Sequence, residues 1–167
     1  MSGNFRIAFG NKSRVGKDES CKYLMEKYQA QEVRFASSLY DCQNCILQRL
    51  GLPLNKNPQL LQLLGEGCRN IFGRDIWLEQ TIKYIETLDQ NKPIVIADLR
   101  HKNEAAAMKK LGFTLVKINR RDRPIDRDPN HISEVDLDNY PFDYEIDNNG
   151  TLEELYGKLE SRIRVLY

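Results

Sequence analysis

The order of apolar and polar residues along the chain predicts strands and helices in alternation. Five apolar runs are short enough for strands, at residues 5–9, 32–36, 93–97, 113–118 and 142–146. Between them, apolar residues recur at helical spacing after residue 17, over 39–88 with breaks near Gly51 and Gly73, over 101–111, and from Thr151 to Ile163. This order predicts one α/β domain over 1–167, with a parallel sheet of about five strands and helices on both faces.

Composition limits the kinds of function that the chain can have. Its 167 residues suffice for one domain with a buried core, and the net charge of +1 gives no reason to expect general nucleic-acid binding. The apolar stretches are too short for a membrane span, and the N-terminus lacks the layout of a signal peptide. We therefore expect a cytoplasmic protein with reduced cysteines, in the host cytoplasm if a phage encodes it. Cys42 and Cys45 form a single C-x-x-C without nearby histidines, which does not favour zinc.

The stretch FGNKSRVGKDES, residues 9–20, is close to the phosphate-loop pattern G-x-x-x-x-G-K-[ST], with Asn11 in place of the first glycine and Asp18 in place of the last hydroxyl residue. A loop between a buried strand and a helix presents backbone N–H groups to an anion, and Lys17 adds a positive charge. Asn11 is acceptable because asparagine adopts positive φ more readily than most residues. The alternative is a plain turn. We expect this segment to bind the phosphates of ATP through Asn11, Lys12, Arg14, Val15, Gly16, Lys17, Asp18 and Glu19.

Two carboxylates near the expected phosphate site are candidate ligands of Mg²⁺. Asp18 cannot donate a hydroxyl, so it would ligate through its carboxylate, act through water, or leave the metal to another group. Asp98 ends a buried strand at the sheet edge where parallel-sheet proteins bind ligands. It could hold Mg²⁺ through water or orient Lys17; the alternative is an aspartate that caps the next helix.

Residues 119–141 are dense in arginine, aspartate, proline and asparagine and have no helical or strand period. Loops of this length in a compact domain are often functional lids, and we expect this one to close over bound nucleotide. Phosphoryl transfer depends mainly on cations around the phosphates. We therefore expect Arg121 and Arg123 to be catalytic, from a set that also holds Arg120 and Arg127. The alternative is an ordinary surface loop.

Five segments, in order, resemble the phage-type deoxynucleoside monophosphate kinases and the related animal phosphomevalonate kinases. GNKSRVGKD is similar to the G-x-K-x-S-G-K-D loop of that family, in which aspartate after the lysine is usual. The other four are RFASSLYD, LLQLLGEGCRNIFGRDIW, VIADLRHKNEAAAMKKLG and HISEVDLDNYPFDYEIDNNGTLEEL. The resemblance covers almost the whole chain, and it implies a P-loop kinase fold with a helical acceptor-binding region over about 37–90 and a lid over about 119–141.

The resemblance also implies roles for individual residues. Arg100 would grip the phosphate of the acceptor, with a surface ion pair to Glu104 as the alternative. Asn148 and Gly150 would lie near the adenine, with a simple turn as the alternative. We expect the acceptor side to include Ser37, Tyr40, Arg69, Trp77, Arg100 and Glu134.

Several of these acceptor-side residues have a structural alternative. Tyr40 and Trp77 could stack on a base or pack in the core, and Arg69 could be a solvated charge. Glu134 and His131 could anchor the lid, assist at the nucleotide, or form a helix cap around Ser133. The chain departs from the family at Tyr40, where lysine is usual, at Ser37 and Ser38, where Asp-Pro is frequent, and at Gly67. The kinase class is therefore better supported than the substrate.

Together these features predict a kinase that transfers a phosphoryl group from ATP, with Mg²⁺, to a (deoxy)nucleoside monophosphate. A hydroxyl acceptor is an alternative, such as a nucleoside, a small alcohol or a hydroxymethylated base in DNA, and Asp98 would then serve as the base. A nucleotide-binding protein without turnover is a second alternative. We expect small nucleotides as binding partners and no association with a membrane. A homodimer is a further alternative.

Overall fold

The computed structural model describes residues 4–124 and 129–166. The chain forms two compact units, a sheet unit of Met1–Val33 and Asp89–Tyr167, and a helical unit of Arg34–Leu88. Each unit is described by itself. Arg127, one of the predicted lid arginines, lies outside the described residues.

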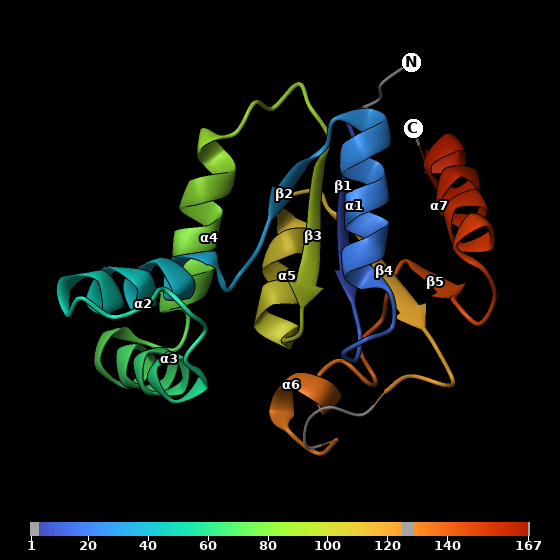
Figure 1. Ribbon diagram of the computed structural model, residues 1–167. Coiled ribbons are helices and arrows are strands. Elements are labelled where there is room, and N and C mark those ends of the chain that lie inside the picture. The colour runs from blue at the N-terminus through green and yellow to red at the C-terminus, as the bar shows by residue number, and fades with distance from the viewer. Residues whose placement is uncertain (1–3, 125–128, 167) are drawn as a thin grey trace. The chain divides into compact units, whose positions relative to one another are not determined.

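A five-stranded parallel sheet forms the centre of the sheet unit (Figure 1). Its strands are β1 (Arg6–Gly10), β2 (Gln31–Val33), β3 (Ile94–Leu99), β4 (Thr114–Asn119) and β5 (Tyr144–Asp147). The order is β2-β3-β1-β4-β5, and each neighbouring pair is parallel. β1 is therefore the central strand, and the loop that follows it begins at the middle of the carboxyl edge.

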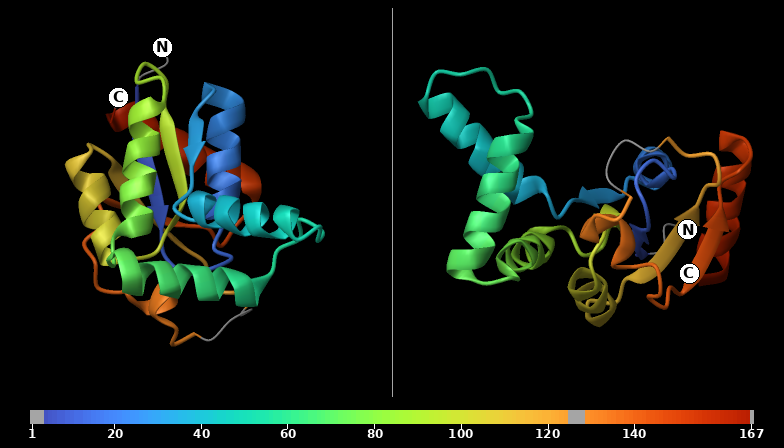
Figure 2. Two further views of the ribbon diagram at one scale, coloured as in Figure 1. Left: turned by 90° about the vertical axis from the view of Figure 1, so that its left-hand side faces the viewer. Right: turned by 90° about the horizontal axis from the view of Figure 1, so that it is seen from below.

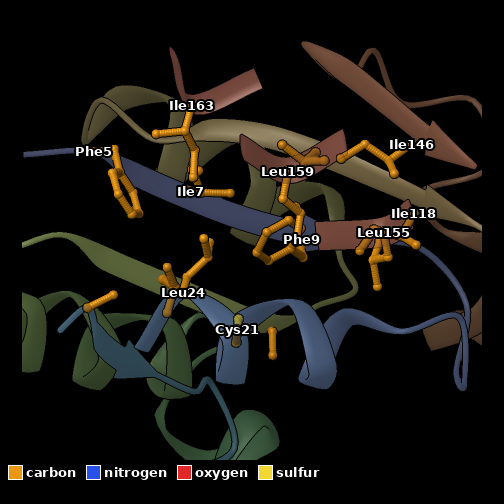
Figure 3. Packing of buried hydrophobic residues seen from close by; sticks show 14 of the residues in the cluster. Phe5, Ile7, Phe9, Cys21, Leu24, Ile118, Ile146, Leu155, Leu159 and Ile163 are labelled. Carbon is orange, nitrogen blue, oxygen red and sulfur yellow. The ribbon is translucent and has the colours of Figure 1, made fainter. Parts of the chain in front are cut away.

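Helices cover both faces of this sheet, as the sequence predicted. They are α1 (Lys17–Tyr28), α5 (Lys102–Lys110) and α7 (Leu152–Leu166), whereas the short helix α6 (Ile132–Val135) lies beyond the carboxyl ends of the strands (Figure 1). α1 and α7 lie on one side and α5 on the other (Figure 2). The main apolar cluster fills the space between α1, α7 and the sheet (Figure 3). Phe9 of β1, Leu24 of α1 and Leu155 of α7 are at most 1% exposed in this cluster, so the base of the loop after β1 is held by a packed core.

The helical unit contains α2 (Ser37–Arg49), α3 (Pro58–Phe72) and α4 (Ile76–Thr87). The predicted breaks are confirmed, because Gly51 and Gly73 have φ of 66° and 108° and follow the first and second of these helices. The indole N–H of Trp77 donates to the carbonyl of Gly65 at 3.2 Å and joins α4 to α3. No helix in the described residues of either unit is long and apolar enough to cross a bilayer.

Two predicted strand boundaries were wrong. The second strand was expected over 32–36, but β2 ends at Val33, because its partners in β3 run only from Ile94 to Ile96 and the chain turns at Arg34, whose carbonyl accepts from the N–H of Ser37. The fifth strand was expected from residue 142, but β5 begins at Tyr144, because its ladder with β4 starts there. The expected lid also contains structure, since Asn119 belongs to β4 and α6 lies within it.

Candidate active site

The loop between β1 and α1 turns through three residues with positive φ. These are Asn11 at 111°, Arg14 at 56° and Gly16 at 109°, so the expectation for Asn11 is confirmed. Gly10, just before the loop, is also restricted, because a Cβ atom there would lie 2.7 Å from the ring of Phe142. The chain therefore wraps tightly at this point, as a backbone that surrounds an anion must do.

Hydrogen bonds from distant segments fix this curve. The side-chain amide of Asn11 donates to the carbonyl of Ile118 and to Oδ1 of Asn119, each at 2.8 Å. The amide of Asn148 donates to the carbonyl of Val15 at 2.9 Å. The end of β4 and the segment after β5 thus hold the two sides of the loop. Sequence reasoning missed the Asn11 contact, although the parallel pairing of β1 with β4 brings these residues together.

Lys17 is buried at the start of α1, with 4% of its surface exposed. Its Nζ donates to the carbonyl of Asn11 at 2.9 Å and to that of Lys12. The ammonium group therefore lies against the carbonyl groups of its own loop. A positive charge, a helix N-terminus and a curved backbone meet here, which is the arrangement that binds a phosphate.

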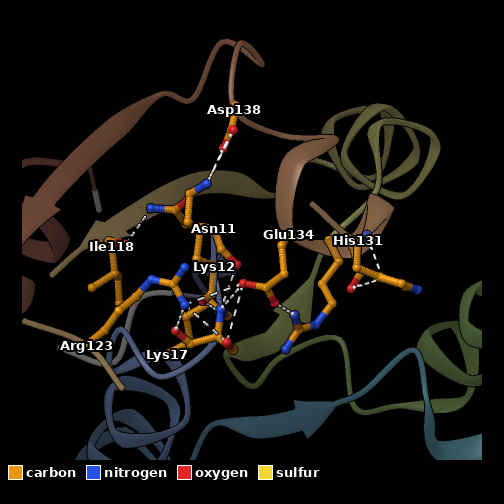
Figure 4. Close-up of polar contacts among 11 residues, drawn as sticks. Asn11, Lys12, Lys17, Ile118, Arg123, His131, Glu134 and Asp138 are labelled. Carbon is orange, nitrogen blue, oxygen red and sulfur yellow. Dashed lines mark hydrogen bonds and ion pairs between the residues drawn. The ribbon is translucent and has the colours of Figure 1, made fainter. Parts of the chain in front are cut away.

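A buried carboxylate joins this loop to two predicted arginines (Figure 4). The side chain of Glu134 is 1% exposed, and its Oε1 lies 2.8 Å from Nη1 of Arg100. Its Oε2 accepts from the backbone N–H of Ser13 at 3.1 Å and from the Ser13 hydroxyl at 3.3 Å. The same oxygen is 3.5 Å from Nη1 of Arg123. Arg123 also donates to the Ser13 carbonyl at 3.3 Å.

Arg100 differs from the alternative considered for it. The carboxylate of Glu104 accepts from the backbone N–H groups of Arg100 and His101, at 2.9 and 3.0 Å, while the guanidinium group pairs with Glu134. The alternative for Arg100, a surface ion pair with Glu104, was therefore wrong, and its role toward the acceptor phosphate stays a prediction. Desolvation raises the pKa of Glu104 to about 7, although the two N–H groups act in the opposite direction.

A cavity of about 180 Å³ lies beside the loop. Its lining brings predicted ATP-binding residues together with the lid arginines: Asn11, Lys12, Val15, Asn119, Arg120, Arg121 and Arg123. The backbone N–H of Arg121 donates to Oδ1 of Asn149 at 2.8 Å, which ties the start of the lid segment to the turn before α7. The phosphate-loop segment and the lid segment, which the sequence analysis identified separately, therefore line the same cavity.

The other predicted residues of the sheet unit lie at its surface or partly within it. Arg14 and Asp18 are exposed, and Asp98 is half-buried near the end of β3. Glu19 accepts from the hydroxyl of Tyr156 at 2.5 Å. Gly150 is exposed in the turn before α7, with the carboxylate of Glu154 against it.

Four of the predicted acceptor-side residues belong to the helical unit. Ser37 and Arg69 are exposed, Tyr40 is half-buried and Trp77 is buried. That these four residues bind the acceptor near Lys17 stays a prediction. Within residues 4–124 and 129–166, no group of three or more His, Cys, Asp and Glu side chains could hold a metal ion.

The segment around α6 contributes contacts that sequence reasoning missed. Asp136 accepts from the backbone N–H of Lys102 at 2.9 Å, and Asp138 pairs with Nζ of Lys12 at 3.1 Å. His131 caps α6, since its Nδ1 accepts from the N–H of Ser133 at 3.2 Å, as one alternative for it proposed. The acidic residues at every second position, Glu134, Asp136 and Asp138, were the available signal.

Comparisons with known proteins agree with this geometry. Residues 58–159, more than half of the chain, match the deoxynucleotide monophosphate kinase family. The uncharacterized protein ORF76 of Ictalurid herpesvirus 1 (strain Auburn) is 29% identical over 171 residues, which cover 95% of this chain and 66% of that protein. A candidate deoxynucleotide monophosphate kinase of Acanthamoeba polyphaga mimivirus is 44% identical over 70 residues, covering 41% of this chain and 35% of that protein. The chain thus spans at most about two thirds of these relatives.

Two solved structures share the fold. Shikimate kinase from Aquifex aeolicus has a TM-score of 0.54 at 16% identity, with 96% of each chain covered. TT1252 from Thermus thermophilus has a TM-score of 0.56 at 14% identity, with 99% of each chain covered. At these identities the likeness concerns the fold, and it matches the parallel five-stranded sheet with helices on both faces.

Proposed function

The chain belongs to the deoxynucleotide monophosphate kinase family, and we propose that it transfers the γ-phosphoryl group of ATP to a (deoxy)nucleoside monophosphate, giving the diphosphate. One observation carries this proposal: the buried Lys17 begins α1 at the end of the loop that contains Ser13, and Glu134 joins this loop to Arg100 and Arg123. Phosphoryl transfer needs little covalent help and is accelerated by fixed cations around the phosphates. The sheet unit supplies such cations from three segments.

The donor nucleotide would lie along the loop. The β- and γ-phosphates would take backbone N–H groups at the start of α1 and the ammonium of Lys17, which must then exchange the carbonyls of Asn11 and Lys12 for phosphate oxygens. The 180 Å³ cavity would receive the nucleoside end, between the loop and Arg121. Asn148, whose amide donates to the carbonyl of Val15, and Gly150 would border the nucleoside.

Mg²⁺ is expected with ATP, and the chain offers carboxylates that suit it. This ion keeps several waters and is usually held by one or two carboxylates together with substrate phosphates. Asp18 in the first turn of α1 and Asp98 near the end of β3 would be these carboxylates, directly or through water. The ion would neutralise charge on the phosphate oxygens.

The acceptor phosphate would be held by Arg100 and, from the helical unit, by Arg69. A monophosphate already carries an ionised oxygen at neutral pH, so the reaction needs arginines and no general base. Ser37, Tyr40, Trp77 and Glu134 would complete this side. Arg121 and Arg123 would act on the transferring group and help to exclude water, since a wet site would allow hydrolysis. The reaction is expected in the cytoplasm, and both a monomer and a homodimer are compatible with this proposal.

The test is a transfer assay with radiolabelled γ-phosphate of ATP and a panel of deoxy- and ribonucleoside monophosphates. We expect label in a nucleoside diphosphate, dependence on Mg²⁺ and loss of transfer in the Lys17→Ala variant. Label in a phosphomonoester of a nucleoside, a small alcohol or hydroxymethylated DNA would instead favour the hydroxyl acceptor with Asp98 as base. ATP binding without transfer to any acceptor would favour a nucleotide-binding protein without turnover.

A further inference from the structure

Glu134 connects three segments that are far apart in the sequence. It is 121 residues from Ser13 of the loop and 34 residues from Arg100, and both interactions are direct, at 3.1 and 2.8 Å. Arg123 lies 3.5 Å from the same carboxylate. We propose that Glu134 is a positioning residue, which holds the phosphate loop, Arg100 and Arg123 in one arrangement before the substrates bind. This inference rests on the proposed kinase function.

The position requires a charged group. Two guanidinium groups that are mostly removed from water repel each other, and a carboxylate between them offsets this repulsion. Glu134, Arg100 and Arg123 together carry one net positive charge, and without the carboxylate the two arginines would carry two. The three side chains together therefore still attract an anion, and the carboxylate fixes the orientation of each guanidinium group.

The carboxylate itself stands on a firmly anchored segment. Asp136 accepts from the N–H of Lys102, Asp138 pairs with Lys12, and Leu137 between them is 4% exposed. These contacts fix the backbone that carries Glu134 to both α5 and the loop. A side chain held in this way can set the position of its partners, rather than follow them.

This role has a consequence that separates it from simple stabilisation. Glu134 competes with a phosphate for the charge of the two arginines, and it also sets their direction. Removal of its charge should therefore strengthen the binding of a simple polyanion and, at the same time, slow the transfer, because a displacement of about 1 Å can cost up to about a hundredfold in rate.

The experiment compares Glu134→Gln with the wild-type chain by calorimetric titration with tripolyphosphate and by kcat of transfer. We expect the dissociation constant of tripolyphosphate to fall by about threefold or more, from the added net charge, and kcat to fall by about tenfold or more. Glu26→Gln is the matched control, because it removes the same charge from an exposed position near the end of α1, which has no part in the loop or in the anchoring of Glu134. Both of its values should stay within about twofold of wild type.

A second variant covers the case in which Glu134→Gln does not fold, since an uncompensated buried charge is destabilising. Glu134→Asp keeps the charge but has a shorter side chain, so kcat should fall while tripolyphosphate affinity stays near that of the wild type. Weaker tripolyphosphate binding in both variants, or an unchanged kcat in either, would overturn the positioning role.

Tripolyphosphate binding needs no acceptor, so the two proposals can fail separately. If the wild type phosphorylates no monophosphate but Glu134→Gln still binds tripolyphosphate more tightly, only the proposed function fails, and ATP hydrolysis then reports turnover. If the wild type transfers phosphate but Glu134→Gln behaves like Glu26→Gln, only the positioning role fails. A wild type that does not bind tripolyphosphate would contradict both.

Discussion

The side-chain amide of Asn148 occupies the space that a Cβ atom on Gly16 would need, while it donates to the carbonyl of Val15 at 2.9 Å. Gly16 also has φ of 109°, which side chains other than hydrogen rarely allow. Two independent constraints thus act on one residue of the loop. They explain why glycine stands there, 132 residues before the asparagine that packs against it.

Gly16→Ala should therefore disrupt the loop. We expect a loss of stability on the order of 1–3 kcal/mol from backbone strain, together with a large loss of ATP affinity as Asn148 is displaced. Gly157→Ala is the control, because a Cβ atom there meets nothing within 4 Å in α7, and it should stabilise by about 0.5–1 kcal/mol. Urea unfolding and calorimetry measure both quantities; equal behaviour of the two variants would contradict the account of Gly16.

Replacements of Asn11 should separate backbone strain from hydrogen bonding. Asn11→Gly keeps access to φ of 111° but loses the bonds to Ile118 and Asn119, at about 0.5–1.5 kcal/mol each. Asn11→Ala loses the same bonds and adds strain of about 1 kcal/mol. The expected order of unfolding free energy is wild type, then glycine, then alanine. An alanine variant as stable as the glycine variant would exclude the strain.

Lys17→Ala should reduce kcat by about a hundredfold or more and leave the fold intact, because the lost charge acts mainly on the transferring group. Circular dichroism checks the fold, and initial rates at saturating substrates give kcat. Lys12→Ala removes a more exposed charge of the same loop and should have a much smaller effect. Near-normal turnover without Lys17 would remove the phosphate-loop interpretation.

Arg100→Met should raise the KM of the acceptor by about tenfold or more, with a much smaller effect on the KM of ATP, because the lost charge-assisted hydrogen bonds belong to one substrate. Arg69→Met should act in the same direction. Lys102→Met is the nearby control, since its cation lies 3.8 Å from Asp136 and away from the loop. Equal increases of both KM values would indicate a structural role for Arg100.

The pH dependence of stability should carry a contribution from Glu104. Its pKa is about 7 in the folded protein, above the ordinary value of 4.5, because burial disfavours the charged form. The folded state thus holds the proton more tightly, so this contribution is fully present below pH 4.5 and is lost as pH rises through 7. The free energy of unfolding of wild type relative to Glu104→Gln should fall over this interval, measured by urea titrations. A constant difference would show that Glu104 has an ordinary pKa.

The local parts of the fold could be predicted from the sequence, because they depend on neighbouring residues. The apolar run before Gly10, the glycine and lysine at the start of α1, and the apolar period of α7 each specify one element. Their alternation then implies a parallel sheet. The short α6 could not be predicted, since four residues give no period.

The long-range part of the site depends on contacts that no periodic pattern encodes. Glu134 was predicted as an acceptor-side residue or a lid anchor, but its bond to Ser13, which spans 121 residues, was not predicted. Glu104 lies at helical spacing from Arg100, but its carboxylate accepts from the backbone N–H groups of Arg100 and His101. The guanidinium group of Arg100 pairs instead with Glu134, 34 residues away. Sequence spacing identifies possible neighbours within an element, whereas burial decides which carboxylate meets which arginine.

The strand order also determines when the loop can form during synthesis. β1 is made first, but its two neighbours, β3 and β4, start at Ile94 and Thr114. At translation speeds of about 5–20 residues per second, roughly 5–20 seconds pass between β1 and the end of β4. Until β3 has been made, β1 has no neighbouring strand to pair with, and until the end of β4 has been made, Asn11 lacks the carbonyl of Ile118. The loop after β1 is therefore made before the other segments of the site and is among the last of them to take shape, and the nascent chain exposes an apolar strand that chaperones can bind.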